Sequence, residues 1–239
     1  MRLRSLFVAI GAAALVLAAC ETDDGVDLDA PDPDETDETE PADPDIDAED
    51  DVDPEATGGT LRAAIGGDPD QVDPHNTTSS FAFTILENVY DTLVQPGDDL
   101  TMEPALAEDW EVSDDLLTIT FFLREGVTFH DGSEFDADDV VASFEHIGRD
   151  GGPNAWRLEA IEDIVATDEL TVEFQLSRPA PNLLEQIGGF KGMAIGPAEA
   201  IEDGTLADEP IGTGPFQFVS FTPGDSVVLE AYPDYWGPG

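Results

Sequence analysis

The chain has 239 residues, 41% of them hydrophobic, which is enough apolar material for the core of one large domain or two small ones. Its 55 acidic residues outnumber 8 lysines and arginines and give a formal net charge of -47, so a nucleic-acid-binding protein is excluded because phosphates would be repelled. Such a charge is typical of a salt-adapted protein, since the Debye length falls to about 3 Å near 1 M salt.

The N-terminal residues have the pattern of an export signal. Arg2 and Arg4 precede an apolar run from Leu6 to Ala19, and small residues come directly before Cys20. The run is shorter than the about 20 residues that a membrane-spanning helix needs. We therefore predict that residues 1–19 are a signal peptide.

Cys20 is the only cysteine, so neither an intramolecular disulfide nor a multi-cysteine metal site is expected. The sequence Leu17-Ala-Ala-Cys20 resembles the lipobox of bacterial lipoproteins, which implies that Cys20 is the lipid attachment site and anchors the chain to a membrane. Roughly half of the residues from Glu21 to Thr57 are acidic, and many are separated by proline. This composition predicts a disordered linker over residues 20–57.

The folded part is predicted to begin at Gly58. Alternating apolar residues predict a strand over residues 60–65, and glycine and proline predict a loop over residues 66–75. Apolar residues at every fourth position then predict a helix over residues 79–94.

The middle of the chain has stronger patterns. Residues 117–124 alternate between apolar and polar and predict a strand, which a turn connects to a second short strand over residues 127–130. Asp136 is placed to cap a helix whose apolar side chains share one face. These side chains are Val140, Val141, Phe144 and Ile147.

Three elements are predicted in the rest of the chain. They are a strand over residues 170–176, a short helix over residues 181–187, and a hairpin formed by residues 216–219 and 226–229. Strands and helices do not alternate regularly, so the fold class is predicted to be mixed α/β, or α+β.

The sequence contains none of the common catalytic motifs, and its three histidines lie in different predicted elements. An exported hydrolase would need a nucleophile beside a base, so we predict neither an enzyme nor a cofactor nor a metal. His130 and Asp131 are either a metal pair or part of a catalytic triad, or His130 simply hydrogen-bonds the adjacent turn, which is the commoner arrangement. His146 is expected to be structural.

Three residues are candidates for ligand contacts. His75 lies in a Gly/Pro-rich loop, where ligands are often bound. Trp156 also lies in a predicted loop and is either a ligand wall or a cap on the core. Lys191 is one of very few basic residues and is a candidate for an anionic ligand group or a solvated surface cation.

Three stretches, in this order and spacing, resemble the family 5 extracytoplasmic solute-binding proteins of peptide and nickel ABC importers. The resemblance covers nearly all of residues 58–239. The stretches run from Gly58-Gly-Thr-Leu through Asp73-Pro-His75 to Asn88-Val-Tyr-Asp-Thr-Leu-Val94, from Pro104-Ala-Leu-Ala-Glu-Asp-Trp110 to Asp138-Asp-Val-Val-Ala-Ser-Phe144, and from Gly212-Thr-Gly-Pro-Phe216 to Tyr232-Pro-Asp-Tyr-Trp-Gly237.

The resemblance implies a periplasmic-binding-protein-like type II fold, a two-lobed receptor that closes on its ligand. It implies that residues 58–78 and 189–239 belong to lobe I and residues 79–188 to a small subdomain. The turn at Asp114-Asp115-Leu116 lacks a glycine that family members commonly have. Family members are about twice as long, so we expect this chain to be an N-terminal portion without the second lobe, with no tight ligand binding of its own.

The resemblance also implies a function. It implies an extracytoplasmic receptor, anchored by lipid to the outer face of the cytoplasmic membrane, that delivers oligopeptides to an ABC permease. Receptors for nickel chelates, opines or oligosaccharides, or an adaptor built on half of the fold, are the alternatives. The ligand-binding residues implied are His75, Thr77, Phe81, Trp156 and Lys191.

Overall fold

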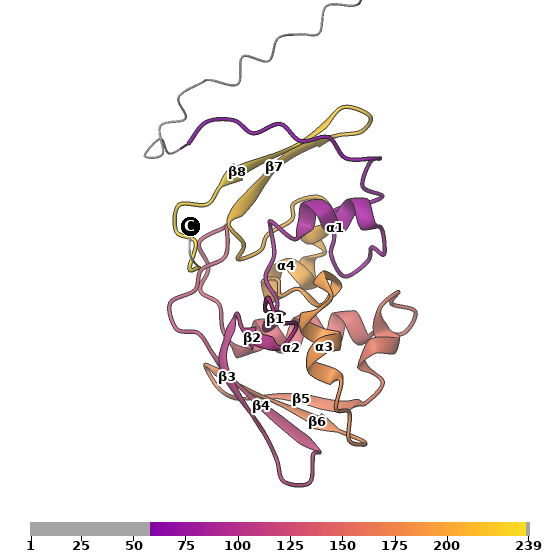
Figure 1. Cartoon of the computed structure of the whole chain (residues 1–239), viewed down its shortest axis with the longest axis vertical. Coiled ribbons are helices and arrows are strands. Elements are labelled where there is room, and N and C mark those ends of the chain that lie inside the picture. The colour runs from indigo at the N-terminus through magenta and orange to yellow at the C-terminus, as the bar shows by residue number, and fades with distance from the viewer. Residues whose placement is uncertain (1–57, 238–239) are drawn as a thin grey trace, which may run out of the picture. The chain divides into compact units, whose positions relative to one another are not determined.

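The computed structural model of the chain describes residues 58–237, so the predicted signal peptide, Cys20 and the predicted acidic linker lie outside the described residues. The described residues from Leu61 onward form one compact unit, and the description below concerns that unit. It contains both helices and antiparallel strands, which confirms the mixed α/β class (Figure 1). None of the helices between residues 58 and 237 is long and apolar enough to cross a membrane.

A four-stranded antiparallel sheet contains the strongest sequence patterns. Its strands are ordered β3 (Ala107–Val112), β4 (Thr118–Leu123), β6 (Thr171–Leu176) and β5 (Ile161–Asp168). Alternate residues of β4 and β6 are buried, as the period of two along a strand requires. The strands predicted over residues 117–124 and 170–176 are therefore confirmed, with Phe121 paired to Val172.

The helix α2 (Ala137–Gly148) packs against this sheet, and its predicted cap is confirmed. The Asp136 carboxylate accepts hydrogen bonds from the backbone N–H groups of Asp138 and Asp139, and the Asp139 carboxylate accepts one from the Asp136 N–H. This reciprocal arrangement satisfies backbone donors that the first turn of a helix leaves free.

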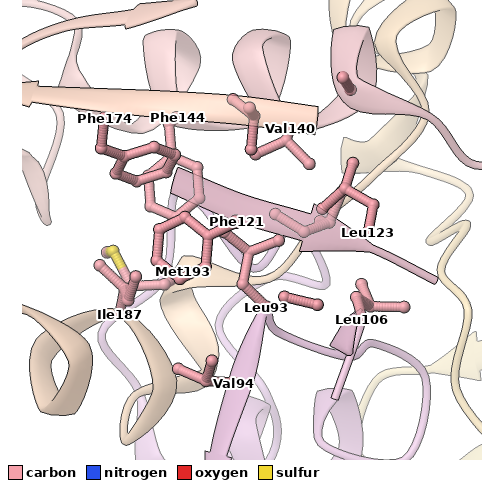
Figure 2. Packing of buried hydrophobic residues seen from close by; sticks show 14 of the residues in the cluster. Leu93, Val94, Leu106, Phe121, Leu123, Val140, Phe144, Phe174, Ile187 and Met193 are labelled. Atoms are coloured by element: carbon pink, nitrogen blue, oxygen red, sulfur yellow. The ribbon is translucent and has the colours of Figure 1, made fainter. Parts of the chain in front are cut away.

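Aromatic rings join the helix to the sheet in the larger apolar core (Figure 2). The Phe174 ring lies edge-on to Phe144 at 4.9 Å and to Phe121 at 5.1 Å between ring centroids. Ile187 and Met193 close the core from later segments of the chain. Edge-to-face pairs of this kind add about 0.5–1.5 kcal/mol each beyond the burial of their area.

The other elements are shorter and connect or cover these layers. They are α1 (Ser80–Leu86), β1 (Val94–Pro96), β2 (Met102–Pro104), η1 (Ala155–Leu158), α3 (Leu183–Gly188), η2 (Lys191–Met193), α4 (Ala198–Asp203), η3 (Thr205–Ala207), β7 (Phe216–Thr222) and β8 (Ser226–Ala231). The predicted short helix over residues 181–187 corresponds to α3, and the predicted hairpin corresponds to β7 and β8.

The helix predicted over residues 79–94 is too long. It ends at Leu86, and Val89 and Leu93 are buried although they lie outside it. The Gly214 N–H donates to the Val89 carbonyl at 2.9 Å. In a longer helix, the Val89 carbonyl would accept a hydrogen bond from within the helix, but here it accepts one from a segment more than 120 residues away. Tertiary structure therefore overrides the local pattern.

Two predicted strands are wrong. Residues 60–65 are not assigned to a strand, and Leu61 is 92% exposed. Residues 127–130 contribute only an isolated bridge between Thr128 and Glu134, although the predicted tight turn beyond them is present, with the Gly132 N–H donating to the Phe129 carbonyl. An alternating pattern gives a strand only where another strand supplies its hydrogen bonds.

A second apolar cluster lies between α1 and the hairpin. Ala82 and Leu86 of α1 pack with Val89, Tyr90, Val72 and Ala194. The hairpin side chains Phe218, Phe221 and Leu229 cover this cluster. The segments near residue 72 and residue 194 therefore meet in one core.

Candidate ligand-binding surface

The loop before α1 is fixed by its own carboxylates. The Thr77 hydroxyl donates to Asp70 Oδ1 at 2.6 Å, and the His75 backbone N–H donates to Asp73 Oδ1 at 2.9 Å. The Asn76 side-chain amide donates to the other oxygen of Asp73. These bonds give the Gly/Pro-rich loop one defined conformation, as short polar side chains often do in turns.

His75 is completely buried within this loop. Its Nε2 lies 2.8 Å from the Ala194 carbonyl, and because a carbonyl can only accept, Nε2 carries the proton. Its Nδ1 is buried without a hydrogen-bond partner in the described part of the chain. Burial lowers the pKa of His75 to about 4, so the imidazole is neutral near pH 7.

Asn154 connects this loop to the segment that carries Trp156. Its side-chain amide donates to the Thr77 carbonyl at 3.3 Å, and the residue is 2% exposed. A β-carbon at Gly192 would lie 3.0 Å from the same amide nitrogen and 2.3 Å from the Phe190 ring. The absence of a side chain at Gly192 therefore lets η2 lie close to Asn154. Three segments distant in sequence therefore meet here, and they bring Thr77, Trp156 and Lys191 into one region.

Two rings hold a guanidinium at the centre of this region. The Arg157 Cζ lies 4.6 Å from the centroid of the Trp156 ring and 3.9 Å from that of Phe190. Both distances are within the range of a cation–π contact. The Phe83 ring of α1 lies edge-on to Phe190 at 4.9 Å. We call Phe83, Trp156, Arg157, Phe190 and Lys191 the Arg157 cluster.

The cluster is open to solvent. Trp156 is 59% exposed, and Arg157, Phe190 and Lys191 are each half-buried. Desolvation lowers the pKa of Arg157 from its ordinary value, but a guanidinium stays charged at neutral pH. The surface therefore presents cations between aromatic faces, on a chain whose net charge is -47.

The residues predicted from the sequence are placed differently from one another. Trp156 and Lys191 belong to the Arg157 cluster, and Thr77 lies beneath it. His75 is buried below the loop surface. Phe81 is 41% exposed, and its ring lies against the backbone of Gly66 and Gly67.

Sequence reasoning missed Phe83, Arg157 and Phe190. The available signal was a repeated pair, since Trp156-Arg157 and Phe190-Lys191 each place an aromatic residue next to a cation in a chain with few cations. That signal does not say that the two pairs meet in space.

Two cavities lie elsewhere. One of about 670 Å³ lies beside the hairpin, with His130, Ile211 and Phe218 among its lining residues, and one of about 380 Å³ lies between α2 and β5. His130 donates from Nε2 to the Gly214 carbonyl at 2.9 Å and accepts at Nδ1 from the Gly212 N–H. Both of its nitrogens thus bond the Gly212–Gly214 segment and not the adjacent turn.

Within residues 58–237, no three His, Cys, Asp or Glu side chains gather in a way that could hold a metal ion. His146 is half-buried beside His75, with 5.5 Å between the ring centroids. The geometry thus places the best-formed set of exposed ligand-type groups at the Arg157 cluster.

Comparison with known proteins agrees with the sequence pattern. Residues 101–239 match the model of the bacterial extracellular solute-binding proteins, family 5 Middle. The chain is 34% identical over 208 residues to the di/tripeptide-binding protein 2 of Pseudomonas aeruginosa, covering 74% of this chain and 38% of that protein. It is 30% identical over 179 residues to the glutathione-binding protein GsiB of Pectobacterium atrosepticum, covering 74% and 35%.

A solved structure has the same fold. The periplasmic binding protein DppA from Helicobacter pylori, in complex with the peptide STSA, is 32% identical and superposes with a TM-score of 0.64, covering 72% of this chain and 39% of that one. The chain therefore spans between a third and two fifths of the length of these three proteins. From the family match and the shared fold, this chain belongs to the family 5 bacterial extracellular solute-binding proteins, which bind solutes and are not enzymes.

Proposed function

We propose that this protein is the extracytoplasmic receptor of an ABC importer and that its ligands are oligopeptides. The Arg157 cluster carries the proposal, because it gathers exposed aromatic and cationic groups from three segments on one surface. Peptides present the complementary groups, which are apolar side chains, backbone carbonyls and a carboxylate. The di/tripeptide-binding relative and the peptide complex support this ligand class.

Among the residues predicted from the sequence, we propose that Trp156 and Lys191 contact the ligand directly. We propose that Phe81 extends the surface along α1. His75 and Thr77 are buried, so their part in binding is to hold the loop in shape. This loop supports Asn154, whose amide bonds the Thr77 carbonyl.

We also propose the domain layout implied by the sequence, with residues 58–78 and 189–239 in lobe I and residues 79–188 in a small subdomain. Val72 and Ala194 of the proposed lobe I pack in the second apolar cluster although they are far apart in sequence, and Ala82, Leu86, Val89 and Tyr90 of the proposed subdomain share that core with them. A hinge between such units would let the receptor close on its ligand and present it to a permease.

Membrane attachment through Cys20 completes the proposal. The apolar run and the small residues before this cysteine support it. The intact mass of the protein extracted from membranes should include the acyl chains and lack residues 1–19. A Cys20→Ser variant should be released into the soluble fraction, and retention of that variant in the membrane would contradict the anchor.

A binding titration tests the ligand class. The 239-residue chain would be titrated with trialanine, glutathione and nickel–histidine, with tryptophan fluorescence as the readout and a Trp156→Phe variant to identify the responding ring. We expect peptide affinities of about 1 mM, because an open surface buries far less of a ligand than the 70–90% that a closed pocket buries. A response to nickel–histidine alone would favour a chelate receptor, and no response to any peptide would overturn the proposal.

A further inference from the structure

Asn154 occupies the N-cap position of η1 but does not cap that helix. Asparagine is a common N-cap residue because its side-chain oxygen accepts hydrogen bonds from the first N–H groups of a helix. In the described part of the chain, the Asn154 side chain makes no such bond to η1. Its amide nitrogen instead donates to the Thr77 carbonyl at 3.3 Å, across 77 positions of sequence. The side chain therefore serves a contact with a distant segment and not the helix that it begins.

The acceptor of this hydrogen bond belongs to a residue that is itself held in place. Thr77 is completely buried. Its hydroxyl donates to Asp70 Oδ1 at 2.6 Å and accepts from the Ser79 N–H at 3.0 Å. Its carbonyl is thus a fixed acceptor. Because a carbonyl can only accept, any residue that replaces Asn154 in this contact must present an N–H or O–H group.

The chain between α2 and η1 is a loop whose backbone hydrogen bonds join near neighbours. The Gly152 N–H donates to the Arg149 carbonyl, and the Ala155 N–H donates to the Gly152 carbonyl. Bonds between neighbours set the shape of a loop, whereas contacts with distant residues set its position. The Asn154 amide makes a contact of the second kind, and it does so at the start of η1.

Trp156 lies two residues beyond Asn154, within η1. Its side chain is 59% exposed, so packing in the core does little to place the ring. A displacement at the start of this short helix would carry the indole with it. The Asn154 amide also lies against η2, because a β-carbon at Gly192 would be 3.0 Å from its nitrogen. The position of Asn154 therefore decides where the indole lies relative to η2.

We propose that Asn154 is a positioning residue for ligand binding: its amide holds the start of η1 against the loop before α1 and so sets the place of Trp156 on the binding surface. Asn154 is 2% exposed, so it acts through Trp156 and not by touching the ligand. The inference rests on the proposed function, in which Trp156 contacts the peptide. It adds that the affinity of the surface depends on a buried amide beneath it.

The first measurement follows Trp156 without any ligand. The 239-residue chain would be labelled with 5-fluorotryptophan, which gives one ¹⁹F signal for each of its three tryptophans. Trp156→Ala identifies the Trp156 signal by its loss. Asn154→Leu replaces the amide by an apolar group of similar size and should shift or broaden the Trp156 signal. The signals of Trp110 and Trp236 should stay in place, which also shows that the variant is folded.

The second measurement is the affinity for trialanine, followed by the backbone amide NMR signals of the chain labelled with ¹⁵N. We expect Asn154→Leu to weaken binding about threefold to tenfold, the effect of losing one hydrogen bond. In a Trp156→Ala background the same substitution should have almost no further effect, because the two residues act through one ring. A general loss of structure would instead weaken binding equally in both backgrounds.

Asn154→Asp makes the test reversible. An ionised carboxylate cannot donate to the Thr77 carbonyl, whereas a protonated one can. Because burial raises the pKa of a carboxyl, binding by this variant should be weak at about pH 8 and recover toward that of the unmodified chain at about pH 5. The controls are Asn182→Leu and Asn182→Asp. Asn182 is the exposed N-cap residue of α3, and within the described residues its side chain also makes no capping bond, so neither control should change the Trp156 signal or the affinity.

Three results would overturn the inference. If Asn154→Leu leaves both the Trp156 signal and the trialanine affinity unchanged, Asn154 positions nothing and the receptor function stands. If it weakens binding equally with and without the Trp156 indole, the amide supports the fold and does not act through this ring. If trialanine does not bind to the unmodified chain, the proposed peptide receptor is wrong, and a role of Asn154 in binding is wrong with it.

Discussion

The indole N–H of Trp236 donates a hydrogen bond to Oδ2 of Asp91 at 2.9 Å, across 145 positions of sequence. The same carboxylate oxygen accepts from the Thr213 hydroxyl at 3.0 Å, and Arg124 lies 4.6 Å above the Trp236 ring. Asp91 is 7% exposed. A buried carboxylate with two donors thus joins both ends of the third stretch of the family pattern to the segment after α1.

We predict that Trp236→Phe lowers the free energy of unfolding by about 1–3 kcal/mol, because the buried Asp91 carboxylate loses a donor. Urea unfolding followed by circular dichroism measures the change. The control is Tyr235→Phe, which alters the neighbouring aromatic residue but keeps the indole, and it should cost much less. Equal effects of the two substitutions would show that the hydrogen bond is not what stabilises this contact.

Local patterns in the sequence predicted part of the fold. Residues 117–124 and the helix after Asp136 were predicted well because their own periodicity decides which side chains are buried. The region after Leu86 was predicted wrongly, because the Val89 carbonyl accepts a hydrogen bond from the Gly214 N–H. Gly214 is too distant in sequence to influence a local pattern around Val89.

The candidate site was likewise predicted only where the local sequence was informative. Trp156 and Lys191 could be identified because aromatic and basic residues in loops are unusual in this chain. The contact of Arg157 with two rings could not, because Phe190 lies 33 positions away in the sequence and meets it only in the folded chain.

A second prediction concerns the close approach of backbone at Gly212. A β-carbon there would lie 2.1 Å from the Val89 carbonyl oxygen, so alanine requires the backbone to move. We expect Gly212→Ala to lower the free energy of unfolding by about 1–3 kcal/mol, the range for overpacked sites. In Gly148→Ala, the new β-carbon meets only a Leu158 methyl at 3.7 Å, and this variant should melt close to the unmodified protein. Matching losses in the two variants would contradict the argument.

A third prediction follows from the buried His75. Burial lowers its pKa to about 4, below the ordinary value of 6.5, although the Ala194 carbonyl and the Asp73 charge act in the opposite direction. Between these values the unfolded chain binds more protons than the folded chain, so stability falls as the pH drops from about 6.5 to about 4. The loss due to this group should approach about 3 kcal/mol.

The measurement for His75 is urea unfolding at several pH values in that interval. His75→Gln retains a donor for the Ala194 carbonyl and does not titrate, so its stability should depend less on pH than that of the unmodified protein. His146→Gln provides the comparison, because His146 is partly exposed and the change in slope should be smaller. An unchanged slope in His75→Gln would show that the imidazole does not cause the loss.

Asp139 gives a fourth prediction with the opposite sign. Burial raises its pKa to about 6, and the negative charges of Asp136 and Asp138 act in the same direction. The folded chain therefore binds the extra proton between about pH 6 and the ordinary value of 3.8, so this group adds stability as the pH falls. The slope due to one group is at most about 1.4 kcal/mol per pH unit.

Asp139→Asn should remove this contribution. At neutral pH the variant also keeps only one acceptor oxygen for the N–H groups of Asp136 and Ala198, so its absolute stability alone does not test the argument. The test is the slope of the free energy of unfolding against pH, compared between the variant and the unmodified protein. Unfolding at pH values between 4 and 7 measures it. Asp138→Asn changes an exposed carboxylate in the same helical turn and should leave the slope almost unchanged. The same slope in Asp139→Asn as in the unmodified protein would contradict the shift.

The last prediction concerns salt. A net charge of -47 destabilises the compact state through repulsion among carboxylates, and salt shortens the range of that repulsion from about 10 Å at 0.1 M to about 3 Å at 1 M. We therefore expect the midpoint of thermal unfolding to rise by several degrees over this range of sodium chloride concentration. At a pH near the ordinary carboxyl pKa of about 4, many of these groups are neutral and the same salt step should have a smaller effect. An equal rise at both pH values would mean that salt acts by strengthening apolar burial and not by screening, because only the screening term depends on how many carboxylates are charged.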